Sequence, residues 1–105
     1  MKVTGYCESL DRLISAHCLD YERRKAAISE DKMERRTLME YRFLNYRIFT
    51  AAAECVGEQS AELFINEIGQ RRGYAKSDTE MCETVYKHSK LRVKIAIARK
   101  LNLLD

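Results

Sequence analysis

The stretch EDKMERRTLMEYRFLNYRIFTAAAECV, from Glu30 to Val56, decides the fold of this chain. Its apolar residues recur at the spacing of an α-helix, and they form two faces rather than one. The main face consists of Met33, Leu38, Tyr41, Leu44, Ile48, Phe49, Ala52 and Cys55. The second face consists of Met39, Phe43, Tyr46 and Ala53. A helix that is apolar over most of its circumference is predicted to lie in the middle of a domain.

Within this helix, YRFLNYRIF interleaves aromatic residues with arginines, a combination that could stack on nucleic-acid bases. Helical spacing, however, places Tyr41 and Phe49 on the main face and Phe43 and Tyr46 on the second face. Core packing is therefore the favoured interpretation of these aromatic residues. Asn45 lies on the core side and needs a hydrogen-bond partner there, because an unpaired buried amide is costly.

Start and stop signals divide the rest of the chain into three more helices. Ser29 can cap the central helix, and Gly57 suits its end. Ser77 and Glu80 match a capping box, which predicts the start of the last helix. The sequence thus predicts an all-α, single-domain four-helix bundle over 1–105, with helices near 5–28, 30–56, 61–72 and 78–101.

Composition fits one folded domain, because 105 residues with 46% apolar and 33% charged side chains can bury a core. The four cysteines contain no CxxC pair, which favours reduced thiols over a disulfide framework. The first residues lack the apolar run of a signal peptide, and no apolar stretch is long enough to span a bilayer. We therefore expect a cytoplasmic protein without a membrane span.

The net charge is only +3, but residues 85–105 carry six bases against one acid. On a helix, Lys87, Lys90 and Lys94 form one row there, and a second row consists of His88, Arg92 and Arg99. A narrow apolar strip of Leu91, Ile95 and Ala98 lies between the rows, and the opposite face, expected to pack on the central helix, consists of Val85, Val93, Ala96, Ile97 and Leu104.

Three interpretations of this last helix remain open. Its cations could be solvated and favoured by the negative end of the helix dipole. Its two rows could each follow the phosphates of a nucleic acid. Alternatively, Leu91 and Ile95 could dock on another protein or on a membrane surface, with the flanking bases attracting acidic groups there.

The segment FINEIGQRRGYAKSDTEM, from Phe64 to Met81, resembles the helix-turn-helix of small phage and mobile-element regulators, including those similar to the last DNA-binding region of sigma factors. The points of match are Ile68, Gly69, Gly73, Tyr74 and Ser77. The resemblance implies that the helix after the turn enters the major groove through its first residues, which here are Lys76, Ser77, Thr79 and Glu80.

The leading hypothesis is a small non-catalytic protein that acts on nucleic-acid machinery, either on DNA or RNA or on a protein that holds them. We name its expected contacts the predicted basic surface: Lys87, Lys90, Arg92, Lys94, Arg99, Lys100, Arg71, Arg72 and Lys76. Leu91 and Ile95 are the expected apolar docking strip. The alternative is a mobile-element inhibitor or adaptor that works by protein contact alone, as anti-CRISPR nuclease inhibitors do.

No motif marks a catalytic residue, and no pair of histidines or cysteines has the helical spacing of a metal site. We therefore expect no enzyme activity, no metal, no cofactor and no small-molecule substrate. A homodimer remains open.

Overall fold

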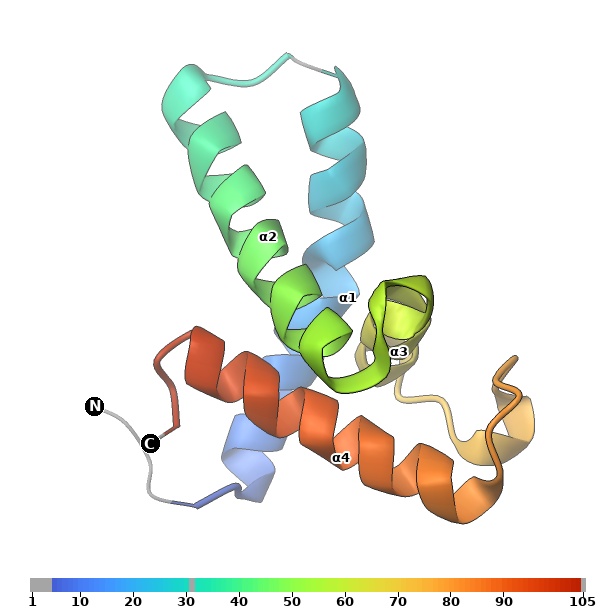
Figure 1. Cartoon of the computed structure of the whole chain (residues 1–105). Helices are drawn as coiled ribbons and strands as arrows, with labels where there is room; N and C mark the ends of the chain where they lie inside the picture. Colours follow the sequence, from blue (N-terminus) through green and yellow to red (C-terminus); the bar gives the residue numbers. More distant parts are fainter. Residues whose placement is uncertain (1–4, 31, 105) are drawn as a thin grey trace.

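The computed structural model describes residues 5–30 and 32–104, and these residues confirm the all-α prediction. Four α-helices follow one another along the chain: α1 (Glu8–Glu30), α2 (Arg35–Val56), α3 (Glu58–Gln70) and α4 (Glu83–Lys100). A short 3₁₀ helix, η1 (Tyr74–Lys76), lies in the connection between α3 and α4. Figure 1 shows α1 and α2 as a long hairpin, with α3 and α4 packed at one end of it.

The core lies where all four helices meet. It is built from fully buried side chains of each helix, including Ile14, Ile48, Phe64 and Ile97. The distal part of the hairpin, where α1 ends and α2 begins, projects beyond α3 and α4 (Figure 1). The buried residues of α2 accordingly lie from its middle onward: they are Asn45, Ile48, Ala51 and Ala52. The prediction that this helix lies in the middle of the domain is therefore confirmed only for that part of α2.

Two glycines allow this arrangement. Gly57 adopts a positive φ of 86° at the corner between α2 and α3, and its N–H donates to the carbonyl of Ala53, so the predicted helix end is confirmed. Gly69 lies against the backbone of α1, where an added Cβ would come within 2.6 Å of the Leu19 nitrogen. No larger residue could occupy that crossing without moving one of the two helices.

Two predicted caps are wrong. Ser29 belongs to the last turn of α1, and α2 begins five residues later than expected, after Glu34. Ser77 does not cap α4, because its hydroxyl donates to the buried carboxylate of Glu67, at 2.7 and 2.9 Å from the two oxygens. The helix begins at Glu83 instead.

Glu67 explains the late start of α4. Its carboxylate also accepts hydrogen bonds from the Tyr86 hydroxyl at 2.7 Å and from the Asp78 N–H at 3.4 Å. These bonds hold the connecting segment in a non-helical path across α3. As a result, the residues that the helix-turn-helix resemblance assigns to the major groove do not lie in the first turn of an α-helix: Lys76 ends η1, and Ser77, Thr79 and Glu80 lie in the segment between η1 and α4.

Candidate functional site

Part of the predicted basic surface is used by the fold, and Lys94 is the clearest case. Its ammonium lies 2.9 Å from a carboxylate oxygen of Asp11 on α1, and its side chain is only 20% exposed. Arg71 approaches the other oxygen of Asp11 at 3.3 Å, and the Tyr6 hydroxyl donates to the same group at 2.8 Å. Partial burial favours the neutral acid, but the bonds from Lys94 and Tyr6 and the nearby positive charges hold the pKa of Asp11 below its ordinary value.

Lys90 also points into the structure. Its ammonium donates to the carbonyl of Arg72 and lies 5.7 Å from the centre of the Tyr86 ring. Burial, followed by the charge of Lys94, lowers the pKa of Lys90. The expectation that Lys87, Lys90 and Lys94 form one solvent-facing row is thus wrong for two of its members. Lys87 is exposed and pairs with Glu83 one turn away, at 3.0 Å.

The other members of the set do not converge on one surface. Lys100 pairs with Glu54 of α2 at 3.2 Å, and the Arg72 guanidinium donates to the carbonyl of Lys76. Lys76, Arg92 and Arg99 are exposed. Among the residues that the structure describes, no carboxylate forms an ion pair with Lys76 or Arg92.

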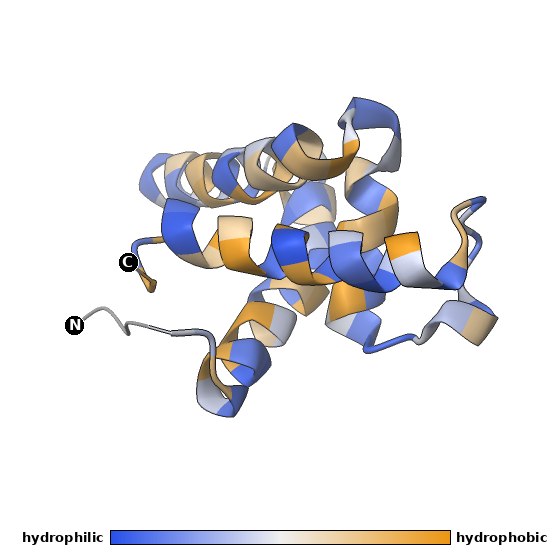
Figure 2. Ribbon diagram, turned by 60° about the horizontal axis from the view of Figure 1, so that its bottom comes forward, coloured by the Kyte–Doolittle hydropathy of each residue, from blue (hydrophilic) through white to orange (hydrophobic). Residues whose placement is uncertain are grey.

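The predicted apolar strip on α4 reduces to one exposed residue. Leu91 is 47% exposed, whereas Ile95 packs partly against the core and Ala98 is fully buried. On the opposite side, the expectation that Val85 packs on the central helix is wrong, because Val85 is exposed, and the neighbouring Tyr86 lies in the core instead. The buried face of α4 includes the polar Ser89, and hydrophilic and hydrophobic residues are mixed along the helix (Figure 2), so its periodicity is hard to recognise in the sequence.

A second surface, on the projecting half of α2, is more apolar. Met39, Phe43 and Tyr46 are 59%, 59% and 67% exposed, and their spacing of four and three residues places them on one side of the helix. We call these three residues the outer face of α2. The interpretation of Phe43 and Tyr46 as core residues is therefore wrong, whereas Phe49 does pack against the core. The sequence had signalled this face as the second apolar stripe.

Arginines flank the outer face on both sides. Helical spacing puts Arg42 on one side and Arg36 and Arg47 on the other, and we call these three the basic rim. The Arg47 guanidinium lies over the Phe43 ring, 4.7 Å from its centre, a cation–π contact. Arg36 approaches Glu40 at 3.5 Å, with both side chains well exposed. No described carboxylate pairs with Arg42 or Arg47.

A shallow hollow lies beside Tyr46, between α1 and α2. It is lined by Tyr21, Lys25, Ile28, Arg42, Asn45, Tyr46 and Phe49. A second hollow continues along α2 from Tyr46 and Phe49 to Glu58. The outer face thus adjoins recesses that could accept side chains of another molecule.

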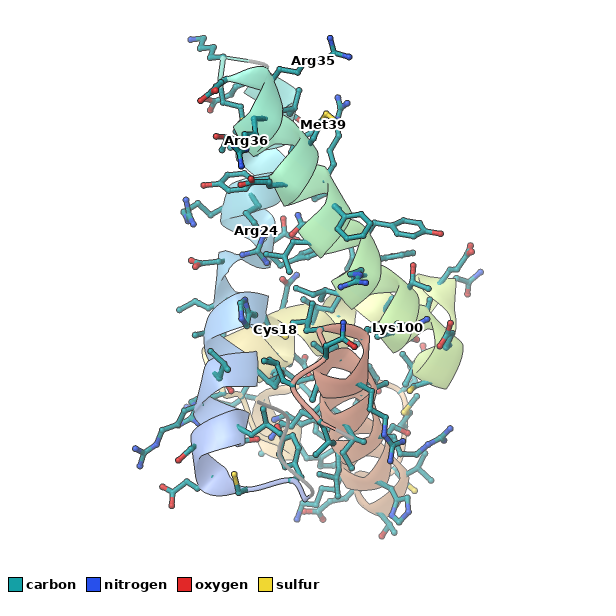
Figure 3. The ribbon with its side chains drawn as sticks, turned by 90° about the vertical axis from the view of Figure 1, so that its left-hand side faces the viewer. Cys18, Arg24, Arg35, Arg36, Met39 and Lys100 are labelled. Carbon is teal, nitrogen blue, oxygen red and sulfur yellow. The ribbon has the colours of Figure 1, made fainter. Side chains whose placement is uncertain are left out.

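Buried polar contacts hold the hairpin beneath this surface. The Arg24 side chain, almost fully buried, donates to the Asn45 side-chain oxygen at 2.7 Å and to the His17 carbonyl at 2.8 Å. The Asn45 amide donates to the carbonyl of Tyr21 at 3.1 Å, which confirms that Asn45 has a partner. Figure 3 shows Arg24 between α1 and α2, and Arg35 and Met39 near the far end of the hairpin.

The histidines and cysteines form no comparable site. Within residues 5–30 and 32–104, no group of three His, Cys, Asp or Glu side chains could hold a metal ion. Burial raises the pKa of the Cys18 thiol to about 12, and burial together with the charge of Arg24 lowers the pKa of His17. None of the described helices is apolar over a length that would cross a bilayer.

Comparisons with known proteins place the chain in no family. No protein-family model matches it, and neither a curated protein nor a solved structure matches it at the significance we required.

Proposed function

We propose that this chain is a non-catalytic binding protein that attaches to a partner protein through the outer face of α2. Its role would be that of an inhibitor or adaptor of cytoplasmic machinery, exerted by contact alone. The observation that carries the proposal is the exposure of Met39, Phe43 and Tyr46 on one side of a projecting helix.

The residue types support a protein interface. Tyr, Phe, Met and Arg are enriched where proteins meet, and they supply most of the binding energy there. Burial of each large side chain of the outer face would contribute on the order of 2 kcal/mol. The core does not use these three side chains, so they are available to a partner.

The geometry supports the same conclusion. The outer face lies on the half of the hairpin that projects beyond α3 and α4, which leaves room for a second molecule alongside (Figure 1). The buried bonds between Arg24, Asn45 and Tyr21 fix the two helices relative to each other. A face held in place before binding loses little conformational entropy when a partner docks.

Site-specific photo-cross-linking tests the proposal. A benzophenone amino acid replaces Phe43 in one variant and Leu91 in a matched control, since both positions are exposed and apolar. Both variants are irradiated in an extract of the organism that encodes the chain, with and without nuclease. We expect a discrete protein adduct from position 43 that nuclease does not remove, and none from position 91. Adducts from position 91 alone, or none from either position, would refute the proposal.

A second candidate is direct contact of α4 with nucleic acid. Arg92 and Leu91 are exposed on α4, and Lys76 is exposed beside it. Affinity for a short duplex or single strand would then fall steeply with salt, and R92A with K76A would flatten the slope. Substitution of Lys90 or Lys94 is a poor test, because both side chains contribute to the fold.

A further inference from the structure

We infer that the partner presents an acidic amphipathic helix to the outer face of α2. This inference rests on the proposed function and adds the chemistry of the partner. It is argued from the charges around the face, from its shape, and from the hollows beside it.

The charge around the outer face is strongly positive. Residues 32–47 contain five bases, Lys32, Arg35, Arg36, Arg42 and Arg47, against two acids, Glu34 and Glu40. Among the described residues, Glu40 forms its ion pair with Arg36, and Lys25 on the neighbouring helix is paired with Glu62 at 2.6 Å. The charges of Arg42 and Arg47 therefore remain available to carboxylates from outside the described chain.

The arrangement of these charges selects an amphipathic partner. The outer face is an apolar ridge, and the basic rim lies on both of its sides. A complementary surface has apolar side chains along its middle and carboxylates along both edges. A helix with leucine-like residues at three- and four-residue spacing and glutamates beside them has this pattern, and helices pack on one another by such ridges.

The hollow beside Tyr46 provides an anchor point. Ile28, Tyr46 and Phe49 form its apolar wall, and Arg42 lies at its edge. A leucine-sized side chain of the partner could enter it, while a neighbouring glutamate meets Arg42. An apolar anchor surrounded by charge pairs is the usual organisation of a binding hot spot.

A second copy of the chain is a poorer occupant. It would bring an identical basic rim against this one, and like charges facing each other across an interface are unfavourable. Nucleic acid also fits less well. One side of the Phe43 ring is covered by Arg47, and Met39 offers an apolar surface rather than a plane for base stacking.

The test uses two helical peptides of about 15 residues. Both carry leucines at the same positions, and one has glutamate where the other has lysine. Binding to the full chain is measured by fluorescence anisotropy at low and moderate salt. We expect the glutamate peptide to bind at least about tenfold more tightly, with affinity falling as salt rises. The charge-reversed variant R42E with R47E should invert this preference.

The control is R92E on α4, an exposed arginine away from the outer face, which should change neither affinity. Circular dichroism confirms that each variant is folded. Equal binding of the two peptides, or binding of neither, would overturn the inference. Concentration-dependent mass that F43S abolishes, or displacement of the glutamate peptide by a short oligouridine, would assign the face to a second copy or to nucleic acid. This assay contains no cellular partner, so a negative result here would refute the acidic helix without refuting a cross-linked partner at position 43. The two proposals can therefore be refuted independently.

Discussion

Two basic helices of this protein use their charge in opposite ways. On α4, which carries the denser run of bases, Lys87, Lys94 and Lys100 each pair with a carboxylate, those of Lys94 and Lys100 on other helices. On the projecting half of α2, which has fewer bases, Arg42 and Arg47 have no described carboxylate as a partner and border exposed apolar side chains. A run of cations in a sequence therefore says little about free charge until the positions of the acids are known.

The apolar residues of the two helices differ in the same way. Those of α4 that seemed available to a partner are mostly used by the core, and Leu91 is the exception. On α2 the reverse holds for Phe43 and Tyr46, which were expected in the core and are exposed. The difference follows from position: α4 lies across α1 and against the end of α2, whereas the first half of α2 projects away from α4 (Figure 1).

The largest predicted effect is a difference in protein stability between a substitution on α4 and one on the outer face of α2. I97A removes a fully buried side chain of α4 and should lower the free energy of unfolding by about 2–4 kcal/mol. F43A on the outer face of α2 should lower it by less than about 1 kcal/mol, mostly through the lost contact with Arg47. Urea unfolding measures both. Comparable losses would mean that the outer face contributes to the core after all.

A smaller effect should come from the polar contacts beneath the outer face. N45A removes the acceptor of the Arg24 guanidinium inside the hairpin, which should lower the free energy of unfolding by about 1–3 kcal/mol. The control on the same helix is R42A. The Arg42 side chain is exposed and forms no ion pair with a described carboxylate, so this substitution should change the free energy of unfolding by less than about 0.5 kcal/mol. Thermal or urea unfolding checks both, and a neutral N45A would remove the argument that the face is held in place.

The stabilisation from the ion pair between Asp11 on α1 and Lys94 on α4 should depend on pH. D11N breaks the pair with Lys94 and should lower the free energy of unfolding by about 1–2 kcal/mol near neutral pH. Because the pKa of Asp11 is lowered on folding, its contribution is present above the ordinary value of 3.8 and is lost as pH falls through the folded-state pKa. Unfolding curves for wild type and variant should therefore converge in acid. A constant difference at every pH would contradict this account.

The smallest effect should come from the one lysine of the row that does face solvent. K87A breaks an exposed pair with Glu83, with side chains 67% and 60% exposed. We expect a change in unfolding free energy of less than about 0.5 kcal/mol, reduced further by salt. The comparison is K94A, which removes a largely buried pair, and an equal effect of the two substitutions would contradict the assignment of Lys94 to the fold.

Helix content and order could be predicted because they depend on local periodicity and on breakers such as Gly57. The starts of α2 and α4 could not be predicted from the local capping patterns at Ser29 and Ser77. Ser77 satisfies a local pattern, but its hydroxyl bonds to Glu67, ten residues earlier, and this tertiary contact outweighs the local preference.

The candidate site was visible only in part. The second apolar stripe of α2 contained Met39, Phe43 and Tyr46, but a stripe does not reveal whether another helix covers it. That depends on where α3 and α4 pack along α2, which is set by contacts distant in sequence. The same is true of Lys94, whose partner Asp11 belongs to the other end of the chain.

The Glu67 carboxylate has a consequence for how the molecule opens. It accepts bonds from Ser77, Asp78 and Tyr86, so α4 and the segment before it cannot leave α3 separately without stranding a buried negative charge. Amide hydrogen exchange should therefore report α3, this segment and α4 as one cooperative unit, while the distal turns of α1 and α2 exchange faster and independently. Local opening of the distal turns of α1 and α2 would then leave the packing of α3, the connecting segment and α4 intact.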